Sequence, residues 1–155
     1  MPLTDTPRCF RPGTFLLALV AIGLTGCAHV RPAEPSCFHR NATIENDIGY
    51  CAAVRVGETL YVSGTVGGGE MAAAVRQSYE RLQETLKAHG LTFADVVKET
   101  VYTTDLDAFK NHRDVRKEFY DATVPAATWV QVDRLFEPGY VVEVELTAAY
   151  PKHGR

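Results

Sequence analysis

The chain has 155 residues, the length of a single globular domain. Hydrophobic residues make up 46% and charged residues 23%, which is an ordinary globular composition. The formal net charge is −3, and there is no cluster of lysine and arginine and no basic–aromatic interleaving. These features argue against nucleic-acid binding and against an electrostatic grip on acidic lipids.

The N-terminal segment is typical of a signal peptide at residues 1–26. Arg8 and Arg11 precede the apolar run Phe15–Leu24, which is too short to span a bilayer, since spanning needs about 20 residues. The tetrapeptide LTGC then ends at Cys27 and resembles the lipobox of bacterial lipoproteins, in which the cysteine is acylated. We expect cleavage before Cys27 and lipidation of its thiol. An ordinary secretory signal and a buried N-terminal helix are the alternatives.

Acylation at Cys27 would anchor the protein to the cell envelope. Each buried CH₂ contributes about 0.8 kcal/mol, so several acyl chains give lasting attachment. Ala28 rather than aspartate follows the cysteine, which by resemblance to lipoprotein sorting favours the outer membrane, on its periplasmic face. Residues 27–41 then form the lipidated cysteine and a tether, which includes the proline-containing stretch Val30–Ser36.

Cys37 and Cys51 stay in the exported part of the chain. In an oxidising compartment they form a disulfide if their Cα atoms come within bridging distance, and otherwise remain two separate thiols. The sequence has no CxxC or HExxH motif, and its five histidines are scattered. It therefore predicts no metal site.

The first half of the domain contains one predicted strand and one predicted helix. Leu60–Gly64 is a compact strand candidate. Thr65–Gly69 lacks the lysine of a P-loop and the spacing of a dinucleotide fingerprint, so we interpret it as a flexible strand-to-helix connection. Glu70–His89 has apolar residues at three- and four-residue steps and ends at Gly90. We expect this helix to cover a sheet; a partner-binding or membrane helix is the alternative.

The second half predicts a strand in Phe93–Thr103, a helix at Leu106–Tyr120 and a β-hairpin in Val124–Tyr150. The hairpin consists of two alternating runs joined through Phe136–Gly139. Its strands would place Trp129 and Gln131 on the same face as Glu143 and Glu145. The element order favours an α+β fold with helices on one face of a mixed sheet, and self-association would cover the other face.

Several stretches then resemble one family. They are IGY at 48–50, VRVGETLYVSG at 54–64, RQSYERLQETLKAHGLTFADVVKETVYTTDLDAF at 76–109 and VVEVELTA at 141–148. Together they are similar to the RidA family, also called the YjgF/YER057c/UK114 group. The resemblance implies a chorismate-mutase-like domain at 42–151, with a tail at 152–155. It also implies a mixed six-stranded sheet, two helices on one face and a homotrimer built around a central barrel.

The resemblance also implies a function. Active members hydrolyse small enamines and imines to a keto acid and ammonia, without a cofactor, in clefts between subunits. A tyrosine lines the pocket, an arginine holds the substrate carboxylate and a glutamate positions water. By position the tyrosine corresponds to Tyr50 and the glutamate to Glu143, whereas the arginine position holds Ala127. Losing a bidentate guanidinium–carboxylate contact should weaken the binding of small α-imino acids.

Other residues can modify this site. Arg113 is the candidate replacement cation, with an exposed helical arginine as the alternative, and Arg134 is interpreted as a surface residue of the hairpin. Trp129 either fills the cleft, stacks on a flat ligand or packs in the core or at a subunit interface. Glu143 is the candidate general acid–base residue or an interfacial carboxylate. Glu145 is interpreted as structural, and Tyr50 either offers its hydroxyl to the pocket or simply packs.

Two functions follow as hypotheses. The first is an exported, lipid-anchored imine or enamine deaminase whose specificity has moved away from small α-imino acids because Ala127 replaces the arginine. The second is a non-catalytic trimer that binds a small metabolite or acts as a scaffold at the membrane surface. A basic residue that converges on Glu143 would favour the first.

Overall fold

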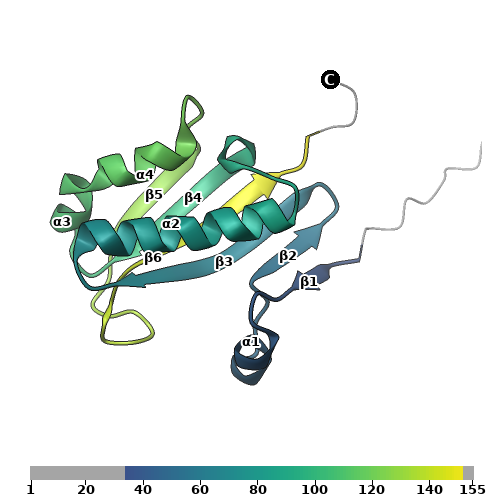
Figure 1. Ribbon diagram of the computed structural model, residues 1–155, viewed down its shortest axis with the longest axis horizontal. Helices are drawn as coiled ribbons and strands as arrows, with labels where there is room; N and C mark the ends of the chain where they lie inside the picture. The colour runs from purple at the N-terminus through teal and green to yellow at the C-terminus, as the bar shows by residue number, and fades with distance from the viewer. Residues whose placement is uncertain (1–33, 152–155) are drawn as a thin grey trace, which may run out of the picture. The chain divides into compact units, whose positions relative to one another are not determined.

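The computed structural model describes residues 34–151 (Figure 1). The strands are β1 (Ser36–Phe38), β2 (Ala53–Val56), β3 (Thr59–Gly68), β4 (Val96–Thr103), β5 (Ala126–Gln131) and β6 (Tyr140–Ala149). The helices are α1 (Ala42–Ile48), α2 (Met71–Ala88), α3 (Leu106–Asn111) and α4 (Arg113–Tyr120), with a 3₁₀ turn at Phe93–Asp95. The expected signal peptide and Cys27 lie outside these residues. No helix in the described range is long and apolar enough to cross a membrane.

The six strands form one sheet in the order β1-β2-β3-β6-β4-β5. Neighbouring strands are antiparallel except β4 and β5, which are parallel. Helices α2, α3 and α4 lie on one face of this sheet (Figure 1). The expected mixed six-stranded α+β architecture is confirmed. The sheet begins at Ser36 in β1, so folded structure starts earlier than residue 42, where we expected the domain to begin.

The predicted hairpin in Val124–Tyr150 is wrong. β4 lies between β5 and β6, so these two consecutive strands do not pair with each other. β5 reaches its place through α3 and α4, and a strand–helix–strand crossover of this kind makes β4 and β5 parallel. Local β-propensity predicts both strands correctly, but it does not say which strands are neighbours.

The glycine run is not a flexible connection. β3 continues through it, and Gly67 pairs with Val142 of β6. A Cβ atom at Gly67 would lie 2.8 Å from the Cα of Ala74 in α2. The glycine therefore lets the helix approach the strand backbone closely, which is a packing role.

The helices also differ from expectation at two places. α1 was not predicted, although the Asn41 side chain accepts the N–H of Ile44 at its start and Gly49 ends it with φ +92°. The helix predicted at Leu106–Tyr120 is divided at His112 into α3 and α4. The division leaves α3 packed against β5 and α4 packed against α2.

The core lies between α2 and the sheet. Val75, Tyr79 and Leu82 of α2 are fully buried against β-strand residues such as Val101 and Val144. Burying such side chains is worth about 1.5–3 kcal/mol each, so this helix owes its stability to the apolar stripe that the sequence predicts.

A buried carboxylate lies in the same layer. Glu99 of β4 is 0% exposed, and its Oε1 accepts from Nε of Arg116 at 2.7 Å and from the indole N–H of Trp129 at 3.1 Å. Its Oε2 accepts from the hydroxyls of Tyr79 at 2.7 Å and Tyr120 at 2.6 Å. Burial first, and then the charge of Glu99, raise the pKa of both tyrosines, which keeps them as donors.

Trp129 and Gln131 therefore lie on the helix face of the sheet. Trp129 packs edge-on against Phe109, with ring centroids 5.2 Å apart, and Gln131 Oε1 accepts the N–H of Leu106. The expected common face with Glu143 and Glu145 is wrong. Alternation within one strand shows which residues share a face, but it does not align two strands that are not neighbours.

Candidate functional site

Glu143 lies on the sheet face turned away from the helices. It is a β6 residue, flanked by Val66 of β3 and Tyr102 of β4 in the register. Its neighbours in sequence, Val142 and Val144, are fully buried in the core. Strand alternation then places Glu143 on the opposite, open face, together with Glu145.

Two hollows meet at Glu143. The first has a volume of about 420 Å³, and its apolar wall includes Ile44 and Ile48 of α1, Tyr50 and Phe136. The second, of about 460 Å³, is lined by Tyr102, Val132, Arg134, Leu135, Phe136 and Glu143. A carboxylate between apolar walls, with a hydroxyl and a guanidinium nearby, is a suitable arrangement for binding a small polar molecule.

The backbone of β3 makes room for the Glu143 side chain. A Cβ atom at Gly64 would overlap the Glu143 carboxylate and would lie 2.8 Å from its Cγ. Gly64 falls in an irregularity of the β3–β6 register, between Val62 and Thr65. This glycine positions the carboxylate and was missed by sequence reasoning, although a glycine inside a strand is a known signal of close approach.

The environment of Glu143 favours its neutral form. Burial raises its pKa, and the nearby charge of Glu145 raises it further. The pKa of Tyr102 is also raised, by burial first and then by Glu145 and Glu143, and its hydroxyl lies 3.4 Å from Glu145 Oε1. An acid whose pKa is moved upwards is better suited to exchanging protons near neutral pH.

The predicted site residues are only partly brought together. Tyr50 shares a hollow with Glu143 and is 40% exposed. Ala127 is an exposed residue of β5, on the helix side opposite Glu99. Trp129 is half-buried, packs against the core with its indole N–H bound to Glu99, and lines none of the hollows around Glu143 within the described chain. Arg113 is exposed on α4, where it donates to the carbonyl of Lys110 at 2.6 Å.

Arg134 is instead the cation that lines a hollow with Glu143. Sequence reasoning placed it on the surface of a hairpin. Because β5 and β6 are separated by β4, the segment that joins them crosses the end of β4, and this path brings Arg134 beside Tyr102 and Glu143. The arrangement depends on strand order, which no local motif reports.

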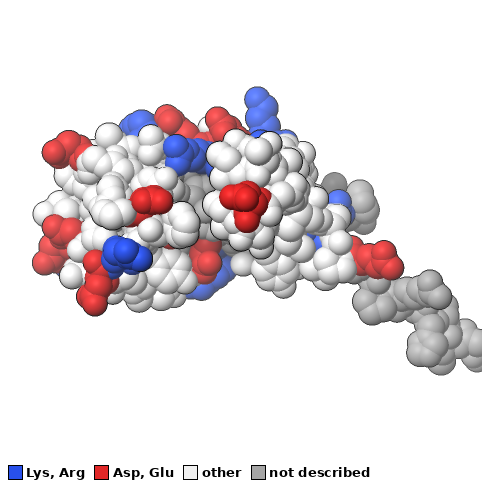
Figure 2. Space-filling model, turned by 90° about the horizontal axis from the view of Figure 1, so that it is seen from below, with Lys and Arg blue, Asp and Glu red and all other residues white. Residues whose placement is uncertain are grey.

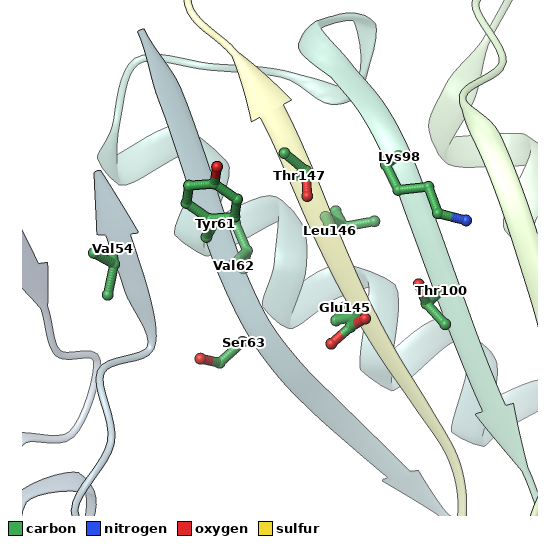
Figure 3. Close-up of a pocket in the computed structure, with 9 residues that line it drawn as sticks. All are labelled: Val54, Tyr61, Val62, Ser63, Lys98, Thr100, Glu145, Leu146 and Thr147. Carbon is green, nitrogen blue, oxygen red and sulfur yellow. The ribbon is translucent and has the colours of Figure 1, made fainter. Parts of the chain in front are cut away.

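The open face holds a further shallow hollow of about 240 Å³. Figure 3 shows Tyr61 and Ser63 of β3, Glu145 of β6, and Lys98 and Thr100 of β4 on the side of the sheet away from the helices. The Ser63 hydroxyl donates to the carbonyl of Cys51 at 2.7 Å. Among residues 34–151, no helix covers this polar face.

Cys37 and Cys51 form a disulfide, with their Cα atoms 5.5 Å apart. With His39 they make up the one group of potential metal ligands found in residues 34–151, all ligand atoms lying within 4.8 Å of one another. Both sulfur atoms are committed to the disulfide, which leaves the imidazole as the remaining ligand. His39 and its contacts were not anticipated from the sequence.

The fold and this site define a class of small α+β proteins with a carboxylate on the open face of the sheet. Comparison with known proteins gives the family. Residues 41–150 match the family model described as endoribonuclease L-PSP. The bovine 2-iminobutanoate/2-iminopropanoate deaminase is 35% identical over 108 residues, covering 64% of this chain and 78% of that protein. The RutC family protein YjgH of Escherichia coli is 32% identical over 111 residues, covering 66% and 84%.

Solved structures agree with this relationship. The crystal structure of Rv2704, a YjgF/YER057c/UK114 family member of Mycobacterium tuberculosis, superposes with a TM-score of 0.69 at 32% identity, covering 75% of this chain and 99% of that one. The chain belongs to the RidA/YjgF family.

Proposed function

We propose that this protein hydrolyses a small imine or enamine, with Glu143 handling the proton of the attacking water. The supporting observation is the half-buried Glu143 carboxylate at the junction of two hollows, with its pKa raised by burial and by Glu145. Relatives named 2-iminobutanoate/2-iminopropanoate deaminase share this family.

The chemistry requires one water and one proton shuttle. Glu143 accepts a proton as water adds to the carbon of the protonated imine, which forms a neutral carbinolamine. The same carboxyl group then donates that proton to the nitrogen, and the C–N bond breaks. The hydroxyl proton passes to the departing ammonia, which leaves a carbonyl product and ammonium. An enamine first takes a proton on carbon to become the imine. Tyr102 and Tyr50 offer hydroxyls around this carboxylate.

The preferred substrate would differ from a small α-imino acid. Ala127 stands where the family resemblance places the carboxylate-binding arginine. Arg134 lines the Glu143 hollow and supplies a cation from another direction. An anionic group on the substrate would then bind beside Arg134, in the 131–136 segment, and not beside an arginine on β5.

The endoribonuclease description is not carried over. A phosphodiester substrate needs cations or a metal near the reacting phosphate. Three carboxylates line these hollows against two cations, and they are Glu137, Glu143 and Glu145 against Lys98 and Arg134. On the side of the molecule drawn in Figure 2, basic and acidic side chains are interspersed and no continuous basic stripe is visible. These charges disfavour a nucleic-acid backbone.

We further propose that the protein is a homotrimer anchored in the cell envelope. The polar open face, with Tyr61 51% exposed beside Lys98 and Glu145, is the surface that neighbouring subunits would cover. The LTGC tetrapeptide supports acylation at Cys27 and export. Sedimentation analysis tests the trimer. Incorporation of a labelled fatty acid, lost in Cys27→Ser, tests the anchor.

The catalytic proposal is tested by ammonia release from imines that an amino-acid oxidase generates in situ. Wild type and Glu143→Gln are compared in the full-length chain carrying Cys27→Ser, with unfolding temperature and oligomeric state measured for both. We expect Glu143→Gln to lose turnover while the assembly persists. Equal turnover in the variant would remove Glu143 from the reaction. No turnover by wild type, together with saturable metabolite binding, would favour the non-catalytic binding trimer, which the missing arginine at Ala127 supports.

A further inference from the structure

The disulfide between Cys37 and Cys51 has a histidine–carboxylate pair beside it. His39 Nε2 lies 3.1 Å from Cys37 Sγ, and His39 Nδ1 lies 3.0 Å from Glu45 Oε2. Glu45 is only 2% exposed, and its carboxylate also accepts the backbone N–H groups of Arg40 and Asn41. A carboxylate accepts hydrogen bonds, so Nδ1 carries its proton and Nε2 is directed at the sulfur.

We propose that Cys37–Cys51 is a thiol–disulfide exchange site in which His39 handles the proton, and that its redox state controls the order of the α1 wall of the Glu143 pocket. A disulfide that only braces the fold needs no proton acceptor at its sulfur. Here the imidazole is oriented by a buried carboxylate, and Cys37 lies exposed on β1, an edge strand that another molecule can reach.

The reductive step uses an external dithiol, such as a thioredoxin-like protein. One of its thiols gives its proton to His39 Nε2 as its sulfur attacks the exposed Cys37 Sγ. The Cys37–Cys51 bond breaks, and its electron pair goes to Cys51 Sγ, which takes a proton from water. The second thiol of the dithiol then loses its proton to water and attacks the mixed disulfide at the dithiol's own sulfur. The bond to Cys37 breaks, and the Cys37 thiolate takes the proton from His39 Nε2. The protein gains two electrons and two protons, and the dithiol becomes a disulfide.

The redox state reaches the pocket through the segment between the two cysteines. That segment contains α1, and its residues Ile44, Ile48 and Tyr50 form the apolar wall of the hollow that holds Glu143. Ile44 is 55% and Ile48 51% exposed, so apolar burial contributes little to holding α1 in place. The buried Glu45 binds residues 39–41, which belong to the same segment. A helix this short is not stable by itself, so the cross-link that closes the segment adds a constraint on its order.

The exchange reaction is tested in the full-length chain carrying Cys9→Ser and Cys27→Ser. Every thiol that is then detected comes from Cys37 or Cys51. Reduction by dithiothreitol is followed by trapping free thiols with an alkylating reagent. We expect His39→Ala to slow reduction by about tenfold or more, and added imidazole to restore part of the rate. His89→Ala is the matched control, because His89 packs edge-on against Phe38 of the same strand, with ring centroids 4.9 Å apart. Equal rates in wild type and His39→Ala would overturn the proposal.

The coupling to the pocket is tested by hydrogen exchange of oxidised and reduced protein. Amides of α1 should exchange about tenfold faster after reduction, while those of α2 stay unchanged. Unchanged α1 exchange would refute the coupling. The regulatory role of this coupling rests on the proposed hydrolysis, but neither the reduction rate nor the hydrogen exchange requires catalytic activity. If no ammonia is released in either redox state, the proposed hydrolysis is contradicted, whereas the results on disulfide reduction and on α1 remain valid.

Discussion

The side chain of Glu143 lies directly over the backbone of Gly64, so that a Cβ atom at Gly64 would come within 2.8 Å of the Glu143 Cγ. The two residues belong to neighbouring strands, β3 and β6, far apart in sequence. The absence of one side chain thus fixes the position of the proposed proton-transfer group. This relationship predicts an effect of a single methyl group on activity.

We expect Gly64→Ala to displace the Glu143 carboxylate and lower kcat/KM for imine hydrolysis by about 100-fold, since small misplacements of a reacting group cost this much. Gly139→Ala is the control, because a Cβ at Gly139 would meet no atom within 4 Å. Ammonia release and thermal unfolding of both variants provide the measurement. Full activity in Gly64→Ala would show that Glu143 tolerates another position.

The acidic limb of the pH–rate profile should depend on Glu145. The pKa of Glu143 is raised by burial and then by the charge of Glu145. The carboxylate therefore protonates, and stops acting as a base, at a higher pH than an ordinary glutamate. Glu145→Gln removes the neighbouring charge, lowers the pKa of Glu143 and moves the acidic limb to lower pH. Glu137 lines a hollow with Glu143, and Glu137→Gln is the control that should leave the acidic limb at the same pH. An acidic limb that stays at the same pH in Glu145→Gln would contradict the effect of Glu145 on the pKa of Glu143.

Substitutions at Arg134 and Arg113 are expected to differ in their effect on substrate binding. Arg134 lines the hollow with Glu143, whereas Arg113 donates to a backbone carbonyl on α4. We expect Arg134→Gln to raise KM for anionic imines by about tenfold or more and to leave neutral imines unaffected, because hydrogen bonds to charged groups are worth about 1.5–3 kcal/mol. Arg113→Gln should change neither. The reverse pattern would restore Arg113 as the substrate cation.

Ala127→Arg should recover a preference for small α-imino acids. If a neighbouring subunit brings β5 to the Glu143 cleft, the new guanidinium supplies the missing carboxylate contact and raises kcat/KM by about tenfold or more. Ala127→Gln has similar reach without the charge and serves as the control. No gain from the arginine in an active trimer would mean that this position does not face the substrate.

The buried Glu99 pair should matter for stability rather than for chemistry. Removing one partner of a buried ion pair leaves an uncompensated charge, so Arg116→Met should lower the free energy of unfolding by about 3–5 kcal/mol. The exposed pair between Arg76 and Glu118 is the comparison, and Arg76→Met should cost less than about 1 kcal/mol. Urea unfolding measures both. Similar losses in the two variants would mean that Glu99 keeps other compensation.

Much of the fold follows from local patterns. The apolar stripe of α2 and the alternation in β4 and β6 are strong periodic signals, and each element lies close to its predicted bounds. α1 was missed although its Asn41 cap and Gly49 stop are visible in the sequence. The apolar residues of α1 are few and exposed, so the sequence has no periodic apolar stripe that would predict this helix.

Residue types and their spacing along the chain were enough to predict the α+β class and the main helix. The resemblance to the family led us to expect Tyr50 and Glu143 in one site. The tertiary structure was needed to show that β4 separates β5 from β6, that the Trp129 indole binds Glu99, and that Arg134 and Gly64 lie beside Glu143. These contacts join segments whose proximity depends on strand order and register, and these are set by packing of the whole domain rather than by any local preference.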